Sequence, residues 1–421
     1  MKVRISALII DPKKEQHDYS KVVLTESSPY YYNYAEHGFD LAVYEDSAEI
    51  LRKIKEASTV DCIITIGDKI DFTPLNSLSY DYRKRWIHLN EFEPAEIAND
   101  IISVFMNNIN RKTPDDAKLF SIFTCTFNTP LHMFNRLYNS LKLQTYPNWN
   151  WFILDDSTDD KISEYVKKLN DPRIVMIKNI TNHGVIGFNK HAIASICDGD
   201  YLVEVDHDDE LSHDCLALLA KAFTEHPDTD FVYSYAVELI NRAPVDYGNY
   251  FAFGLGRYDD FTVNGKVYHH VATTAPVNAL SVRGITALPN HVRCWKSSFY
   301  HKIGGHNQEL SVLDDMDLLI RTFLHGKMTL IPKVLYIQHE GENIGEGGIR
   351  RCKGATTQSK RFYEIQRTNN LLLRKYNKQI HERILELGGT DPFWIPENES
   401  CNVHASYDKA DLIDFNYTIT V

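Results

Sequence analysis

Acidic residues follow directly after a short strand-forming run in the segment YLVEVDHDDEL, residues 201–211. Asp206 and Asp208 are separated by one residue, so at the end of a strand both carboxylates can face one cation, directly or through water. Carboxylate oxygens suit Mg²⁺ or Mn²⁺, and such ions often carry a diphosphate. A solvated acidic turn or the first turn of a helix explains the same residues, because Asp and Glu are favoured there.

A second acidic pair, Asp155 and Asp156, follows the strand-like run NWFIL and precedes Ser157. A carboxylate just past a strand can accept a hydrogen bond from a nucleotide base or from a ribose hydroxyl. An Asx-turn that caps the next helix is the alternative.

A third acidic cluster lies in LDDMDLLIR, residues 313–321, where Asp314 and Asp315 precede an apolar helical pattern. These carboxylates either match the helix dipole or supply a general base whose pKa is raised by neighbouring carboxylates. His339 follows the strand-like run KVLYI. A lone His is more often structural, but this strand-end position makes His339 a candidate third metal ligand.

The elements that would position these residues alternate between strands and helices. The strand candidates are residues 119–126, 149–154, 174–178 and 201–205, and the helix candidates between them are residues 130–143, 161–169 and 187–197. This alternation predicts an α/β fold with a mostly parallel, doubly wound sheet. Ligands bind beyond the carboxyl ends of such strands, so the polar clusters there could converge in space.

The flanking segments predict further units. Residues 1–112 read as a small α/β domain, with strands at 3–10, 40–44 and 60–66 and helices at 47–57 and 94–109. The polar run 111–116 is the expected linker, and the main domain spans 117–345. A helical extension and tail, residues 346–421, carries helices at 363–376 and 378–387. Residues 245–280 are rich in Tyr, Gly and Phe and read as an insertion or a substrate-facing segment.

The composition excludes several classes of protein. The net charge of −12 argues against a general nucleic-acid binder, which needs clustered Lys and Arg. The seven cysteines are scattered and lack CxxC spacing, so we expect a reducing compartment, the cytoplasm, rather than a disulfide framework. Apolar runs stay well short of the roughly 18 residues that a transmembrane helix needs.

Five motifs in this order resemble a family-2 glycosyltransferase of the GT-A fold over roughly residues 119–339. They are FTCTFNTP, LQTYPNWNWFILDDSTDD, NHGVIGFNKHAI, GDYLVEVDHDDEL and the long run from HKIGG to IQH. The resemblance implies an inverting, metal-dependent transfer of a sugar from a nucleotide diphosphate sugar, UDP-linked, to a hydroxyl of a glycan or other acceptor.

The resemblance also implies roles for single residues. Asp315 matches the catalytic base, and the metal–diphosphate ligands, with Mn²⁺ or Mg²⁺ as cofactor, match Asp206, Asp208 and His339. The nucleotide-binding positions match Thr126, Asn128, Asp155, Asp156, Gly184 and Asn189. If Asp206 and Asp208 are the metal–diphosphate ligands, Asp209 and Glu210 are expected to begin the next helix.

The sequence departs from the family pattern at three places. Asp314-Asp315 replaces a Glu-Asp pair, and Phe188-Asn189 replaces an Arg-Asn pair. A glycine-rich segment at 339–351 replaces the usual Q-x-x-R-W motif, and its Arg350 or Arg351 could reach a diphosphate. The segment PNHVRCW, residues 289–295, resembles part of some bacterial and viral members but has no assigned role.

Two other functions compete with this interpretation. A metal-dependent phosphohydrolase could use Asp206 and Asp208, but the haloacid-dehalogenase pattern wants Thr or Val shortly after the second Asp, where Asp209 and Glu210 stand. A non-catalytic glycan-binding protein is disfavoured by the intact acidic set. For residues 1–112 we expect a structural or docking role, including oligomerisation, because Asp68 follows a strand without a glycine-rich phosphate loop.

Overall fold

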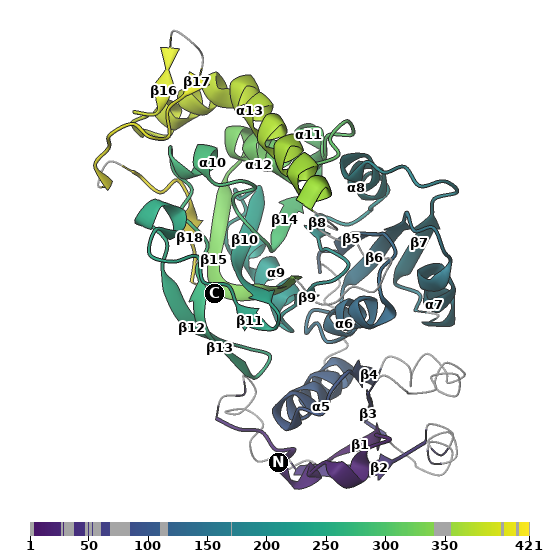
Figure 1. Ribbon diagram of the computed structural model, residues 1–421. Helices are drawn as coiled ribbons and strands as arrows, with labels where there is room; N and C mark the ends of the chain where they lie inside the picture. The colour runs from purple at the N-terminus through teal and green to yellow at the C-terminus, as the bar shows by residue number, and fades with distance from the viewer. Residues whose placement is uncertain are drawn as a thin grey trace.

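The computed structural model describes residues 4–26, 28, 38–46, 49, 53, 60–67, 85–109, 117–169, 171–340, 355–396, 400–409 and 412–420. Most of the helix expected at 47–57, the linker at 111–116, and the residues Asp68, Arg350 and Arg351 lie outside this set. The described part of the chain forms two main sheets, a small one near the N-terminus and a large one in the middle (Figure 1).

The small sheet is parallel, with strand order β2-β1-β3-β4. Its elements are β1 (Arg4–Ile10), β2 (Gly38–Tyr44), β3 (Cys62–Ile66), β4 (Trp86–Leu89) and the helix α5 (Pro94–Ile109). The apolar run of β3 is fully buried, as expected for a central parallel strand with both faces covered. Apolar residues of α5 share a core with β1 and β3.

The large sheet has the order β18-β15-β10-β14-β8-β5-β6-β7. Its strands are β5 (Phe120–Thr126), β6 (Trp149–Asp155), β7 (Ile174–Lys178), β8 (Tyr201–Glu204), β10 (Phe231–Ile240), β14 (Arg293–Lys296), β15 (Met328–Glu340) and β18 (Tyr417–Thr418). Strands β7, β6, β5 and β8 are parallel neighbours, and β10 is parallel to β15. The short β14 lies between β8 and β10 and is antiparallel to both.

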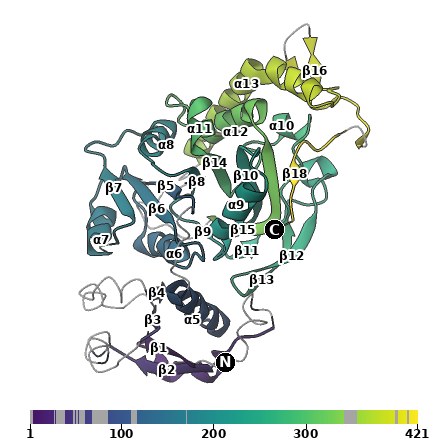
Figure 2. The same cartoon turned by 180° about the vertical axis from the view of Figure 1, so that it is seen from behind.

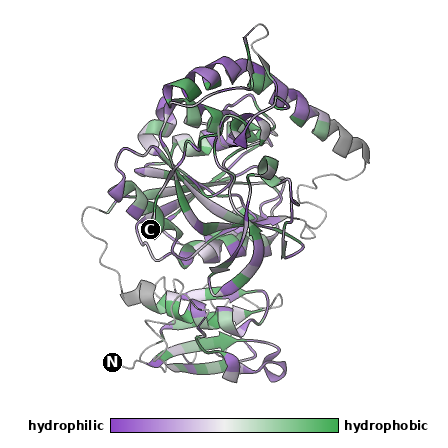
Figure 3. Ribbon diagram, turned by 90° about the vertical axis from the view of Figure 1, so that its left-hand side faces the viewer, coloured by the Kyte–Doolittle hydropathy of each residue, from purple (hydrophilic) through white to green (hydrophobic). Residues whose placement is uncertain are grey.

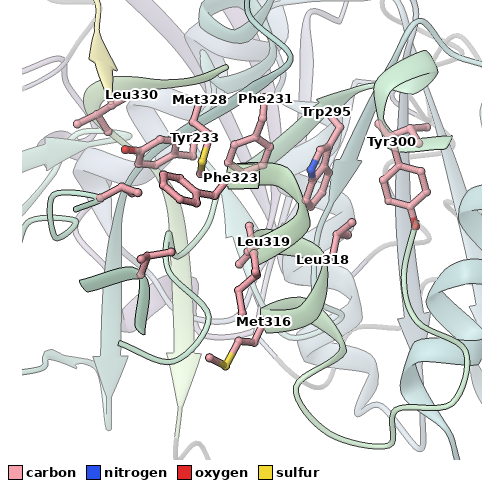
Figure 4. Close-up of a cluster of buried hydrophobic side chains, with 14 of the residues drawn as sticks. Phe231, Tyr233, Trp295, Tyr300, Met316, Leu318, Leu319, Phe323, Met328 and Leu330 are labelled. Atoms are coloured by element: carbon pink, nitrogen blue, oxygen red, sulfur yellow. The ribbon is translucent and has the colours of Figure 1, made fainter. Parts of the chain in front are cut away.

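Helices cover both faces of the large sheet (Figures 1 and 2). One core joins the sheet to α6 (Leu131–Lys142), α7 (Lys161–Leu169) and α9 (Cys215–Glu225). The other joins it to α8 (Ile186–Ser195), α12 (Asp314–His325) and α13 (Ala355–Glu386). In this second core Phe231, Trp295 and Leu319 pack together (Figure 4). The hydropathy colouring shows apolar strands inside and more polar helix faces outside (Figure 3). The predicted α/β class, with a helical C-terminal segment, is confirmed.

Two sequence predictions about single elements were wrong. The C-terminal helices expected at 363–376 and 378–387 are one helix, α13, because Asn377 at the expected break is fully buried and accepts a hydrogen bond from Arg283 (2.7 Å). Asp209 and Glu210 do not begin a helix. Glu210–Leu211 forms β9, which pairs antiparallel with β15.

The segment at 245–280, which we expected to be an insertion or a substrate-facing segment, contains a β-hairpin. Strands β12 (Tyr258–Val263) and β13 (Lys266–Ala272) pair antiparallel around the turn at Asn264 and Gly265. Among the helices that the structure describes, none is both long and apolar enough to cross a membrane.

Candidate active site

The ends of β5 and β6 meet through a direct side-chain contact. Thr126 pairs with Asp155 in the strand register, and its hydroxyl donates to Asp155 Oδ1 (2.9 Å). Lys178 at the end of β7 donates to the other oxygen, Oδ2 (3.0 Å). Asp155 is fully buried, so both of its carboxylate oxygens are occupied by protein partners.

Asp156 organises the loop before α8. Its carboxylate accepts hydrogen bonds from the side-chain amides of Asn179 (2.7 Å) and Asn189 (3.0 Å) and from the backbone N–H groups of His183 (3.0 Å) and Gly184 (3.3 Å). Burial raises the pKa of Asp156, but these donors outweigh it, so the pKa lies below its usual value. Gly184 has φ +73°, a conformation that favours glycine.

Asn128 joins the same region through Ser157 and Thr158. Its backbone N–H donates to the Ser157 hydroxyl (2.7 Å), and its side-chain oxygen accepts from the Thr158 N–H (3.1 Å). The six residues predicted to bind the nucleotide therefore lie at the ends of β5 and β6, on the loop before α8 and, for Asn189, in α8 itself. The structure connects Asp155 to Thr126, and Asp156 to Gly184 and Asn189.

The Asp206–Asp208 segment follows β8 at the same edge of the sheet. The side chain of Asp206 is 36% exposed, and that of Asp208 is 25% exposed. Lys190 Nζ and His291 Nε2 each lie 3.7 Å from an oxygen of Asp206. Burial raises the pKa of Asp206, but Lys190 and His291 outweigh it and hold the pKa below its usual value.

Asp314 and Asp315 stand in the first turn of α12 with different surroundings. Asp315 Oδ2 accepts a hydrogen bond from Arg293 (3.2 Å), and a quarter of its side chain is exposed. Asp314 is buried, with one oxygen 3.9 Å from Lys190 Nζ and 3.7 Å from His306 Nε2. Burial raises the pKa of Asp314. Of the pair, Asp315 is the carboxylate that a substrate can reach.

A buried ionic network, formed by Lys190, Glu204, Arg293 and His306, joins these acidic residues. Lys190 contacts Glu204 directly, while Arg293 (3.6 Å) and His306 (3.7 Å) lie beside the same carboxylate. Burial raises the pKa of Glu204, but Lys190 outweighs it, and the pKa falls well below its usual value. The network connects Asp206 on one side to Asp314 and Asp315 on the other.

The sequence reasoning did not find this network. Lys190 sits in an apolar helix and Arg293 in a segment without periodicity, so neither stands out. A signal was present at Glu204, which interrupts the apolar strand YLVEV. A carboxylate buried in a strand requires a cationic partner, but the sequence does not say which one.

His339 has other partners than those expected. Its Nε2 lies 2.7 Å from Glu210 Oε1, and its backbone N–H donates to the buried Asp209 (2.8 Å). Tyr336 donates to the other oxygen of Asp209 (2.8 Å). These bonds attach the acidic segment to β15, which explains why Asp209 does not begin a helix.

The chemistry of Asp206 and Asp208 fits a divalent cation, because both carboxylates are partly exposed and supply hard oxygen ligands. Within the described residues, however, no three His, Cys, Asp or Glu side chains are grouped closely enough to hold a metal. His339 in particular faces Glu210 in this structure.

The fold and these residues define an α/β protein with an acidic site beyond the carboxyl ends of parallel strands. Residues 121–282 match the model of glycosyl transferase family 2. This match confirms the resemblance to family-2 glycosyltransferases that the sequence predicted.

Two curated relatives have glycosyltransferase or synthase names. WcaA of Escherichia coli strain K12, named as a glycosyl transferase of colanic acid biosynthesis, is 26% identical over 232 residues, which are 52% of this chain and 73% of WcaA. Chondroitin synthase of Pasteurella multocida strain Pm70 is 24% identical over 263 residues, which are 62% of this chain. The matched region spans only 24% of that synthase.

Solved structures show a weaker likeness. S. aureus TarS 1–349 in complex with UDP-GlcNAc matches with a TM-score of 0.44 and 18% identity, covering 64% of this chain and 73% of that one. GalNAc-T7 with UDP, GalNAc and Mn²⁺ matches with a TM-score of 0.41 and 14% identity, covering 54% and 45%.

Proposed function

We propose that the chain is an inverting, metal-dependent glycosyltransferase that moves a sugar from a nucleoside diphosphate sugar, UDP-linked, to a hydroxyl of a glycan or other acceptor. The observation that carries the proposal is the shared ionic network. Arg293 contacts Asp315, the proposed base, and lies beside Glu204, whose partner Lys190 is 3.7 Å from Asp206, a proposed metal ligand. Base and metal ligands are thereby held in one rigid unit.

The donor nucleoside lies beyond the ends of β5 and β6, where Asn128 and Gly184 are accessible to it. The other four proposed nucleotide-site residues are buried and hold this surface in place; they are Thr126, Asp155, Asp156 and Asn189. Asp206 and Asp208 would hold Mn²⁺ or Mg²⁺, with His339 as a further ligand if its bond to Glu210 is exchanged. A cation held by these carboxylates would neutralise the charge that develops on the leaving diphosphate. Arg350 and Arg351, outside the described residues, remain proposed diphosphate contacts.

Transfer takes place in one displacement at the anomeric carbon. The carboxylate of Asp315 takes the proton of the acceptor hydroxyl, whose oxygen bonds to the anomeric carbon opposite the leaving group. The bond from that carbon to the diphosphate oxygen breaks, and its electron pair leaves with the diphosphate. The transition state has oxocarbenium character, and the anomeric configuration inverts. Because one relative is named chondroitin synthase, a glycan is the acceptor to test first.

The test measures UDP release from UDP-sugars with Mn²⁺, with and without glycan acceptors. We expect Asp206→Asn, Asp208→Asn and Asp315→Asn each to lower turnover by about 10²-fold or more. Asp228→Asn is the matched control, since Asp228 is 66% exposed and precedes β10 at the opposite edge of the sheet. Wild-type rates in all three site variants would refute the proposal, and orthophosphate release from phosphomonoesters instead would indicate a phosphohydrolase.

A further inference from the structure

Exposed aromatic rings gather between β11 (Ala243–Pro244) and β13. We call Tyr247, Tyr250, Phe251, Tyr258 and His270 the aromatic patch. Tyr250 is 90% exposed and Tyr247 is 45% exposed. A group of large aromatic side chains exposed to solvent indicates a binding site.

Four rings of the aromatic patch, those of Tyr247, Phe251, Tyr258 and His270, are held in order by one another. Tyr258 and His270 are stacked with ring centroids 4.1 Å apart, and Tyr247 and Phe251 with centroids 5.0 Å apart. The Tyr258 hydroxyl also accepts the backbone N–H of Tyr247 (2.8 Å). Rings fixed in this way lose little conformational freedom when a ligand binds.

The backbone of this segment is strained as well. Ala252, Phe253 and His270 have φ values of 49°, 60° and 55°, which non-glycine residues seldom adopt. Such strain gathers at functional sites, where the surrounding structure holds it in place.

A shallow, open hollow lies beside Tyr258 and His270. Its other lining residues are Gly248, Asn249, Gly256, Arg257 and Asp259. The ring faces can cover the apolar C–H face of a sugar, while Asn249, Arg257 and Asp259 offer hydrogen-bond donors and acceptors to the hydroxyls at its rim.

A chain of contacts links the aromatic patch to the acidic site. The Tyr247 hydroxyl bonds to Glu238, whose other oxygen accepts from Asn290 (2.5 Å). The next residue, His291, lies 3.7 Å from Asp206. The patch therefore borders the same carboxyl edge of the sheet as the proposed metal ligands.

We propose that the aromatic patch binds neutral sugar units of the acceptor, an inference that rests on the proposed glycosyl transfer. The charged side chains around the patch favour a neutral sugar. The exposed carboxylates of Asp246, Asp259 and Asp260 lie in and beside the patch. The cations there are Arg257 and Lys409, which donates to the carbonyl of Gly254 (2.9 Å). Three carboxylates against two cations leave the surface negative, so a polyanionic glycan would be repelled.

Binding is tested first without a donor. Saturation-transfer NMR with cellotetraose, chitotetraose and maltotetraose reports binding, with a chondroitin tetrasaccharide as the anionic comparison. We expect a neutral tetrasaccharide to bind, and Tyr250→Ala and Tyr258→Ala to weaken binding about tenfold, the effect of losing one aromatic contact. Tyr417→Ala, which removes an exposed tyrosine ring (56% exposed) from β18, should leave binding unchanged.

The kinetic measurement separates this inference from the proposed function. In the presence of a hydrolysed UDP-sugar, both patch variants should raise KM for the tetrasaccharide about tenfold while KM for the donor changes less than about twofold. Tight binding of only the anionic glycan, binding of none of the four, or equal binding by Tyr250→Ala would overturn the inference. Absence of UDP release from every donor would instead defeat the proposed function, and the NMR result would still decide the patch.

Discussion

At the scale of single residues, burial separates the two neighbouring carboxylates of the α12 first turn. Asp315 is partly exposed beside Arg293, whereas Asp314 is buried between Lys190 and His306. A reacting group must be reached by its substrate, and a buried carboxylate beside cations mainly stabilises the fold. Variants at Asp315 and Asp314 therefore form a matched pair that separates an effect on catalysis from an effect on stability.

We expect Asp315→Asn to lower kcat by about 10²–10⁴-fold, because the proton acceptor is lost. The change in stability should be small, because the Asn oxygen can still accept from Arg293 and Glu204 also lies beside that cation. Asp314→Asn should instead lower the free energy of unfolding by about 1–3 kcal/mol, because a buried interaction is disturbed. Steady-state kinetics and urea unfolding of both variants check this. Equal losses of kcat in the two variants would contradict the assignment of Asp315 as the catalytic base.

Local sequence singled out Asp206, Asp208 and Asp315 as candidates, because each follows or begins a recognisable element; their roles came from the family resemblance and stay predictions. It could not select Lys190, Arg293 or His306, since their common partner Glu204 is distant in the chain. For His339 the strand-end position was recognised, but its bond to Glu210 depends on β9 pairing with β15, which a two-residue strand does not reveal.

At the scale of elements, the Lys190–Glu204 pair fixes α8 to β8. Both side chains are almost completely buried, and both stay charged. Burial lowers the pKa of Lys190, but Glu204 and its neighbours outweigh this and raise the pKa well above its usual value. Loss of Lys190 removes the direct counterion of the buried Glu204 and leaves Arg293, 3.6 Å away, as the nearest remaining permanent cation.

Lys190→Met should therefore lower the free energy of unfolding by about 3–5 kcal/mol. Adding Glu204→Gln removes the uncompensated charge, so the double variant should be more stable than Lys190→Met alone. Urea unfolding of both single variants and the double variant measures the coupling. If the double variant is no more stable than Lys190→Met, the Lys190–Glu204 pair does not stabilise the contact between α8 and β8.

The parallel strands β5 to β8 and their helices could be read from the sequence, because apolar runs of strand length alternate with helical periods. The antiparallel β14 could not, since RCWK lacks a period of its own and is defined by its neighbours in the sheet. The hairpin of β12 and β13 was not predicted either, because its exposed, Tyr-rich strands do not show a clean alternation of apolar and polar residues.

At the scale of the molecule, α5 of the N-terminal unit packs against the glycosyltransferase domain. Asn99 donates to the carbonyl of Asn264 in the β12–β13 turn (3.0 Å), and Asn264 accepts the backbone N–H of His213 (3.0 Å). The His213 ring is buried beside Ser103 (3.0 Å) and Asp100 (3.8 Å) of α5. These contacts support a structural role for residues 1–112, which we keep as a proposal.

Burial lowers the pKa of His213 from 6.5 to about 4, although Glu210 opposes the shift. Above pH 6.5 the ring is neutral in both states, and between pH 6.5 and 4 only the unfolded chain takes up the proton. Stability must therefore fall as the pH falls through this window. His213→Gln should lose about 2 kcal/mol less than the wild type between pH 7.5 and 5.

Urea unfolding at the two pH values measures this difference. His325→Gln serves as the control, because His325 is exposed at the end of α12. If His213→Gln and the wild type lose equal stability, the buried ring is not the group that responds to acid.

The insertion of β14 between β8 and β10 has a consequence for the order of folding. Arg293 lies opposite Glu204 in the antiparallel register, yet the two are separated in sequence by β10 and the whole β12–β13 hairpin. Contacts between such distant residues form late, because a long loop must close first. A chain emerging from the ribosome can thus complete β5, β6 and β7 early, while Arg293 reaches Glu204 and Asp315 only when β14 adds. Truncated chains that end before this strand should retain the first half of the sheet and lack a working site.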